Sequence, residues 1–224
     1  WRDLLARIEA ANAEGLKVTG QVRGRPTSTL MGFELSENPF LGCPSWQELA
    51  PLNLAGRLNI LRDPSFRARI LSEPGGTPAQ QKRLRDWDWL FQFDDVPDYE
   101  PEPETSIGAM ARRHKKDPAG LAYDMMLQND GKGILYHPMT NYTNGDMSAV
   151  FEMLGHPNTL IGLGDGGAHV GIMCDATDMA HTLTHWTRDR RRGPKRQVEE
   201  MVRRLTFANA EAMGLRDRGL IQVG

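Results

Sequence analysis

A short apolar run that ends in a carboxylate and two glycines constrains the fold of this chain more than any other segment. The apolar residues of 160–163 precede Asp165, and the pair Gly166-Gly167 follows it. This order is typical of a buried strand that presents a carboxylate at its carboxyl end, the edge of an α/β fold where loops vary while the sheet stays rigid. The glycines permit positive φ and leave room for a ligand or metal ion beside the backbone. The alternative is a plain turn in which Asp165 only caps a helix.

The first residues predict one half of a βαβ unit. Residues 1–14 carry apolar side chains at helical spacing, Gly15 stands where a C-cap belongs, and residues 17–22 have a strand pattern. Arg23 and Arg25 follow this expected strand. Two guanidinium groups at the mouth of a strand can clamp a carboxylate through bidentate hydrogen bonds. The alternative is that they are surface charges, since charged residues usually stay solvated.

Residues 27–103 have the least barrel-like pattern. The short helices expected in this region span residues 45–52, 54–62 and 63–71. The last of them has Asp63 as its N-cap and a proline in its first turn. Residues 87–93 alternate aromatic and polar side chains and predict a strand.

The regular order returns after residue 104. Helices are expected at 106–115 and 117–128, a strand at 133–137, and a helix at 146–154. The length of the crossover predicts that the strand 133–137 and the strand before Asp165 form a parallel pair. His137 would then lie at the same edge as Asp165, with Asn141 just beyond it.

Six histidines offer further candidates for the site. His137 and His169 are the two that we expect near Asp165. His181 and His185 stand four residues apart on an expected helix, a spacing that can chelate zinc, but no glutamate lies beside His181 as the HExxH motif requires. We therefore expect packing or supporting roles for that pair.

Composition excludes several classes of function. The formal net charge of −2 favours neither nucleic acid nor an anionic membrane as a partner. No apolar run reaches the ~20 residues that a membrane span needs. Cys43 and Cys174 form no CxxC motif, which favours reduced thiols and a cytoplasmic location over a disulfide or zinc site.

The last third of the chain contains five short motifs, which are Gly162–Gly171, Cys174–Ala176, Leu183–Arg188, Val202–Ala210 and Gly214–Leu220. In this order they resemble the amidohydrolase superfamily, in its branch of N-acyl-D-amino-acid deacylases (D-aminoacylases).

The resemblance implies a fold, a cofactor and a reaction. The fold is α/β, a partial (β/α)8 TIM barrel of the metal-dependent hydrolase type, with one or two divalent ions, usually zinc. The reaction is hydrolysis of a small-molecule amide, with Asp165 as metal ligand and general acid/base. The expected substrate-binding residues are Arg23, Arg25, His137, Asn141 and His169.

The sequence also departs from the family. No His-x-His pair occurs, Gln21 stands in the early strand where a histidine ligand would be expected, and Gly164 replaces the usual serine before Asp165. One carboxylate cannot hold a catalytic zinc, which normally has three protein ligands. We therefore expect a single domain over 1–224 that is the C-terminal portion of a barrel, with 27–103 as an insertion between the strand/helix units 1–26 and 104–213.

On this interpretation the remaining zinc ligands lie outside the chain, and the chain alone is inactive. The expected partner is the N-terminal part of the same protein or a second copy. Two alternatives stay open. One is a cyclic amidohydrolase of the hydantoinase or dihydroorotase kind. The other is a non-catalytic α/β module in which Arg23, Arg25 and His169 bind a small anion and Asp165 is an N-cap.

Overall fold

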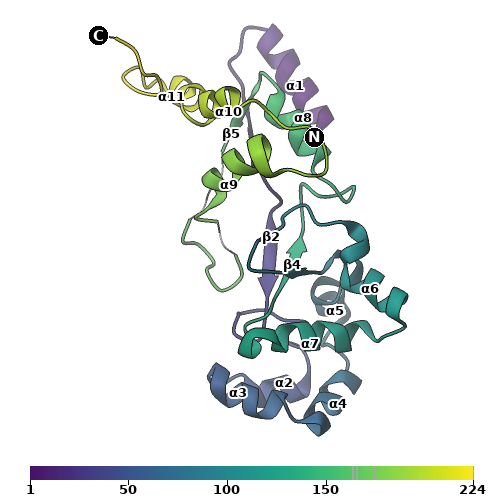
Figure 1. Cartoon of the computed structure of the whole chain (residues 1–224). Coiled ribbons are helices and arrows are strands. Elements are labelled where there is room, and N and C mark those ends of the chain that lie inside the picture. The colour runs from purple at the N-terminus through teal and green to yellow at the C-terminus, as the bar shows by residue number, and fades with distance from the viewer. Residues whose placement is uncertain (163, 165, 174, 224) are drawn as a thin grey trace. The chain divides into compact units, whose positions relative to one another are not determined.

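The computed structural model describes residues 1–162, 164, 166–173 and 175–223. The chain forms two compact units, and its elements are labelled in Figure 1. Unit 1 comprises residues 1–26, 146–168 and 174–224, and unit 2 comprises residues 27–145 and 169–173. No helix among the described residues is long and apolar enough to cross a membrane.

Unit 1 contains a parallel pair of strands covered by helices. Its elements are α1 (Arg2–Ala13), β1 (Gly20–Val22), α8 (Ser148–Gly155), β5 (Thr159–Ile161), α9 (Asp178–Thr184), the π-helical turn η3 (His185–Asp189), α10 (Val198–Leu205) and α11 (Phe207–Ala212). In the parallel register Gly20 lies opposite Thr159 and Val22 opposite Ile161. Helix α8 packs against both strands, and α10 and α11 pack against β5.

Unit 2 contains an antiparallel sheet in the order β2-β4-β3. Its elements are β2 (Ser28–Met31), α2 (Pro44–Leu49), α3 (Leu54–Leu61), α4 (Pro64–Ser72), α5 (Pro78–Leu84), η1 (Trp87–Trp89), β3 (Phe91–Phe93), η2 (Pro103–Thr105), α6 (Ile107–His114), α7 (Pro118–Gly131) and β4 (Ile134–Pro138).

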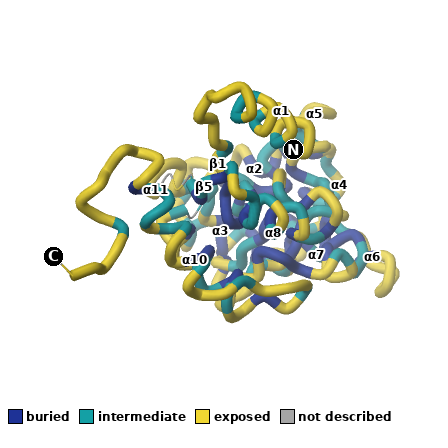
Figure 2. The backbone as a smooth tube through the Cα atoms, turned by 90° about the horizontal axis from the view of Figure 1, so that it is seen from above, coloured by how far each residue is buried: buried dark blue, intermediate teal, exposed yellow. Residues whose placement is uncertain are grey.

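The apolar core of unit 2 combines aliphatic side chains with a group of packed aromatic rings. Tyr123 is fully buried and meets Phe33 and Phe40 edge-on, with ring centroids 5.2 and 5.5 Å apart. Its hydroxyl donates a hydrogen bond to the carbonyl oxygen of Leu61 at 2.7 Å. This bond satisfies the polar end of an otherwise apolar side chain and ties α7 to the carboxyl end of α3. Figure 2 shows buried positions along α7, while α1 and the C-terminal segment are exposed.

Most helix starts agree with the sequence. The helix predicted after Asp63 is α4, and the Asp63 carboxylate accepts a hydrogen bond from the Ser65 amide at 2.7 Å. The helix predicted after Asp117 is α7, where the Asp117 carboxylate accepts from the Gly120 amide at 2.8 Å. The aromatic segment 87–93, predicted as one strand, begins instead with the 3₁₀ turn η1 and continues as β3.

The predicted parallel pairing of the strand at 133–137 with the strand before Asp165 is wrong. That strand is β4, and it lies between β2 and β3 with antiparallel hydrogen bonding on both edges. Both edges of β4 are therefore used, and the parallel partner of β5 is β1. The prediction failed because β2, which occupies one edge of β4, comes from a region that showed no clear strand pattern.

The boundary between the two units falls within the predicted strand/helix unit 104–213, and the single domain over 1–224 stays a prediction. Residues 104–145 belong to unit 2 together with 27–103. The physical reason is that β4, which comes from 104–145, is the central strand between β2 and β3, and both of those strands come from 27–103. That residues 27–103 are an insertion into a barrel stays a prediction.

Candidate functional site at the carboxyl edge of β1 and β5

The parallel pair in unit 1 brings two chemically important segments to one edge. Parallel strands have their carboxyl ends at the same edge of a sheet, so the chain after Val22 and the chain after Ile161 leave β1 and β5 together. The ladder continues one step further, since the Gly162 amide donates to the carbonyl oxygen of Val22 at 3.1 Å. Asp165 follows three positions later but lies outside the described residues, so its catalytic and metal-binding roles stay predictions.

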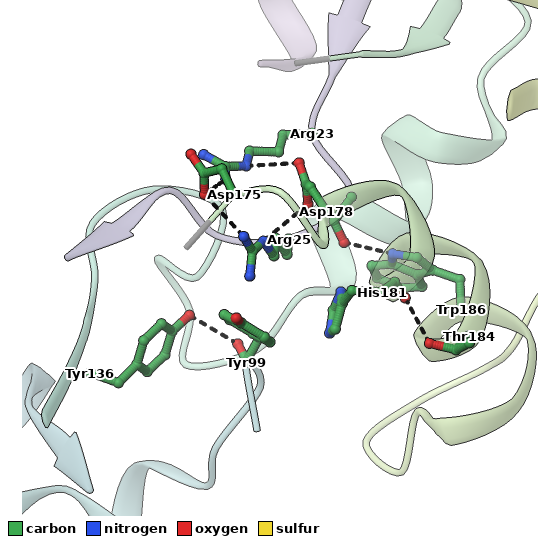
Figure 3. Close-up of polar contacts among 10 residues, drawn as sticks. Arg23, Arg25, Tyr99, Tyr136, Asp175, Asp178, His181, Thr184 and Trp186 are labelled. Carbon is green, nitrogen blue, oxygen red and sulfur yellow. Dashed lines mark hydrogen bonds and ion pairs between the residues drawn. The ribbon is translucent and has the colours of Figure 1, made fainter. Parts of the chain in front are cut away.

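The chain that leaves β1 carries two buried arginines, each paired with two aspartates. Arg23 and Arg25 are 8% and 2% exposed. Their partners are Asp175, which precedes α9, and Asp178, which is the first residue of α9 (Figure 3). The interpretation of these arginines as surface charges is therefore wrong. Burying a guanidinium group without a counter-ion is costly, and the two carboxylates supply that counter-charge.

The two aspartates contact the arginines in different ways. Asp178 places one oxygen near each inner nitrogen: its Oδ2 lies 3.1 Å from Nε of Arg23, and its Oδ1 lies 3.0 Å from Nε of Arg25. Asp175 uses one oxygen, Oδ1, for the outer nitrogens of both guanidinium groups, with Nη2 of Arg25 at 3.0 Å. Burial raises the pKa of Asp178, and the charges of Arg23 and Arg25 oppose that rise.

Gly24, between the two arginines, fixes this arrangement against α9. A Cβ atom at Gly24 would lie 2.1 Å from Oγ1 of Thr182, which is too close for any other residue to fit without movement. The indole Nε1 of Trp186 donates to the carbonyl oxygen of Gly24 at 2.7 Å, and Trp186 is fully buried. The sequence Arg-Gly-Arg therefore combines two charged side chains with a close backbone approach to the helix.

His181 and His185 lie on α9 and the following π-helical turn, with their rings stacked 5.0 Å apart. Burial lowers the pKa of His181 to about 3, and the neighbouring His185 adds to the effect, so the ring is neutral at physiological pH. No group of three histidine, cysteine, aspartate or glutamate side chains in the described part of the chain could hold a metal ion. The packing or supporting role expected for the pair stays a prediction.

The other predicted substrate-binding residues belong to unit 2. His137 on β4 is buried opposite Thr29 of β2, and burial lowers the pKa of its ring, with Asp86 acting in the opposite direction. Its Nδ1 has no hydrogen-bond partner among the described residues. Asn141 and His169 both have left-handed backbone conformations, with φ of 62° and 51°. The expected position of His137 beside Asp165 was derived from the parallel pairing that does not form.

Within unit 2, β2 connects the segments of His137 and His169. One edge of β2 pairs with β4, which carries His137. The Leu30 amide of β2 donates to the carbonyl oxygen of Ile172 at 2.8 Å, and the Ile172 amide donates to that of His169, also at 2.8 Å. His169 itself is exposed. The substrate-binding roles of His137, Asn141 and His169 stay predictions.

Sequence reasoning missed the two aspartates that hold Arg23 and Arg25. Neither Asp175 nor Asp178 was among the residues predicted for the site. The available signal was charge balance: two carboxylates three residues apart follow the loop from one parallel strand, and two arginines follow the other strand. Parallel pairing of those strands brings the two sets to one edge.

The polar groups at the carboxyl ends of β1 and β5 are typical of an α/β protein. Comparison with known proteins agrees with that class. The model of the amidohydrolase family matches residues 18–224. The chain therefore belongs to the amidohydrolase family, whose members are hydrolases, typically metal-dependent, with a TIM-barrel-like fold. No curated protein and no solved structure matches the chain.

Proposed function

We propose that the protein hydrolyses a carbon–nitrogen bond in an N-acyl D-amino acid or a closely similar amide. Membership of the amidohydrolase family supports hydrolysis. The finer assignment is supported by the segment Gly162–Gly171, which resembles N-acyl-D-amino-acid deacylases. The observation that carries the proposal is the parallel pairing of β1 and β5, because it brings Gly162, the first residue of this segment, to the same edge as two buried arginines.

In this proposal Asp165 is the proton carrier of the reaction. Its carboxylate accepts a proton from the attacking water, and the acid so formed returns that proton to the leaving nitrogen when the carbon–nitrogen bond breaks. The products are a carboxylic acid and a free amino acid. Arg23 and Arg25 would bind the carboxylate of the amino acid. The substrate-binding roles of His137, Asn141 and His169 stay predictions.

The expected cofactor is zinc, as one or two ions with Asp165 as one ligand. When bound, such an ion makes the attacking water more acidic. The described residues do not fit a catalytic zinc site by themselves, since they contain no group of three ligands. The proposal therefore assigns the remaining ligands to residues outside this chain, in another part of the protein or in a second copy, and no step above is attributed to the metal.

Hydrolysis assays on two forms of the protein test this proposal. The forms are the protein as its gene encodes it and the 224-residue chain alone, each supplied with zinc. The substrates are N-acetyl-D-methionine, its L-enantiomer and hydantoin. We expect release of D-methionine by the first form and no turnover by the second.

The control compares Asp165→Asn with Asp217→Asn, which makes the same change at an exposed aspartate paired with Arg218. We expect Asp165→Asn to abolish turnover and Asp217→Asn to preserve it. Hydrolysis of hydantoin alone would replace the deacylase with the cyclic amidohydrolase. Carboxylate binding without turnover of any substrate, in a protein that holds no zinc, would favour the anion-binding module.

A further inference from the structure

We propose that helix α10 and the C-terminal segment, residues 214–223, form a docking surface for a second copy of this chain, with the two copies of α10 packed antiparallel about a twofold axis. None of the residues of this surface has a role in the proposed reaction, so the inference does not rest on the proposed function. It rests on an apolar groove in unit 1 and on the charges beside that groove.

The groove lies between α10 and the residues that follow α11 (Figure 1). Its volume is about 640 Å³. Gly219 holds the C-terminal segment close to α11, since a Cβ atom at this position would lie 2.8 Å from Cα of Phe207. The apolar side chains that line the groove are Val198, Val202, Phe207, Leu220 and Ile221.

Most of these apolar side chains are exposed. The exposed fractions are 48% for Val198, 44% for Val202 and 58% for Leu220, and Ile221 is fully exposed. Single exposed apolar residues are common, but a group of them around one groove marks a surface that binds another protein. The two valines lie four residues apart and therefore face the same way on α10, while Met201 is buried and anchors the helix.

The valines have one acidic and one basic residue beside them. Glu199 and Arg203 also stand four residues apart, next to the valines around the helix, and both are exposed. Glu200 and Arg204, one position further along, form an ion pair at 3.3 Å. In the described part of the chain, neither Glu199 nor Arg203 has such an ion-pair partner. Arg203 lies over the ring of Phe207, 5.3 Å from its centroid.

This order of charges is complementary to itself when two copies of α10 run antiparallel. A twofold axis perpendicular to the helices brings one flank of α10 against the same flank of the second copy in reverse order. Glu199 of each copy then faces Arg203 of the other, so two equivalent ion pairs form. In a parallel arrangement each of these residues would face its own counterpart, and like-charge repulsion disfavours that arrangement.

The same axis also brings the apolar parts of the two surfaces together. The midpoint between Val198 and Val202 lies one residue from the midpoint between Glu199 and Arg203. This difference is a rise of about 1.5 Å, which the long arginine side chain accommodates. An apolar centre with a charged border is typical of protein–protein interfaces. A second copy of the chain necessarily presents a groove and charges that match this surface.

Sedimentation equilibrium of the protein as its gene encodes it tests the proposal by charge exchange. We expect a monomer–dimer equilibrium. Glu199→Arg and Arg203→Glu each place like charges across the axis, and each should weaken dimerisation at least about tenfold. The double variant exchanges the two charges, so its dimerisation constant should return to within about threefold of the parent value.

Two further measurements separate this interface from misfolding and from general apolar association. An equimolar mixture of Glu199→Arg and Arg203→Glu should dimerise, because each copy then meets the opposite charge, and recovery in the mixture shows that both variants are folded. Val202→Arg should abolish dimerisation. The matched control is Leu4→Arg, which makes the same kind of change at a leucine of α1 that is 63% exposed and lies outside the groove, and it should leave dimerisation unchanged.

The proposal fails if the protein sediments as a monomer, or if the single charge variants dimerise as strongly as the parent. It also fails if neither the double variant nor the mixture recovers dimerisation, or if Leu4→Arg weakens it as much as Val202→Arg does. A dimer formed by the 224-residue chain but not by the protein as its gene encodes it would assign the groove to another part of the same protein and reject the second copy.

Discussion

Replacing Gly24 by alanine should test how closely the Arg23–Arg25 segment is fitted to α9. The new Cβ would lie 2.1 Å from Oγ1, 2.6 Å from Cγ2 and 2.8 Å from Cβ of Thr182. Thr182 is fully buried, so it cannot rotate into solvent to relieve these contacts. Overpacking of this kind costs about 1–3 kcal/mol, and any shift of the segment also weakens the hydrogen bond from Trp186, a loss of about 1 kcal/mol. We expect the free energy of unfolding to fall by about 2–4 kcal/mol.

A urea titration followed by circular dichroism measures this loss, and a double-mutant cycle assigns its cause. Thr182→Ala removes two of the three close atoms, so the double variant should recover at least about 1 kcal/mol relative to the sum of the single changes. Gly56→Ala in α3 is the matched control, since a Cβ atom at Gly56 would lie 3.4 Å from its nearest neighbours, which is an ordinary contact distance. A change of less than about 0.5 kcal/mol for Gly24→Ala, or additive effects in the cycle, would refute the close fit.

Two other predictions concern buried polar side chains. The pKa of His181 is lowered to about 3 from the 6.5 of an unperturbed ring, so protonation favours the unfolded chain. The free energy of unfolding should therefore fall as the pH drops from 7 to 4, at most by about 1.4 kcal/mol per pH unit. His181→Gln should reduce that slope in urea titrations carried out at several pH values. The raised pKa of Asp178 acts in the opposite direction, so the difference between parent and variant isolates His181. Tyr123→Phe leaves the carbonyl oxygen of Leu61 buried without its 2.7 Å hydrogen bond and should cost about 1–3 kcal/mol in the same assay, and an unchanged midpoint would contradict that role.

Local signals in the sequence predicted most elements but not their pairing. Asp63 and Asp117 mark helix starts because an aspartate side chain satisfies free amides of the first turn, which is a property of a few adjacent residues. Pairing depends on which strand edges are available. The sequence gives no direct sign that β2 would take one edge of β4, since its pattern is short and lies in a region without clear periodicity.

The candidate site shows the same division between local and long-range information. Arg23 and Arg25 were found because two arginines after a strand are a local pattern. Their partners Asp175 and Asp178 come from some 150 positions further along the chain, and only the parallel pairing of β1 and β5 brings them within 3.1 Å. Burial of the arginines also required the fold, because charged side chains are exposed by default.

The entry and exit of unit 2 have a consequence for the order in which this chain acquires its structure. The Met139 amide donates to the carbonyl oxygen of Thr27 at 2.8 Å, so the two ends of unit 2 lie beside each other once that unit is folded. For β1 and β5, the long intervening chain then behaves as a connection of about 25 residues, which lowers the entropy cost of joining them by about 1.5 kcal/mol. During synthesis, unit 2 can therefore fold first. Its folding shortens the connection between β1 and β5, so these strands pair more readily and the arginines and aspartates that follow them come together.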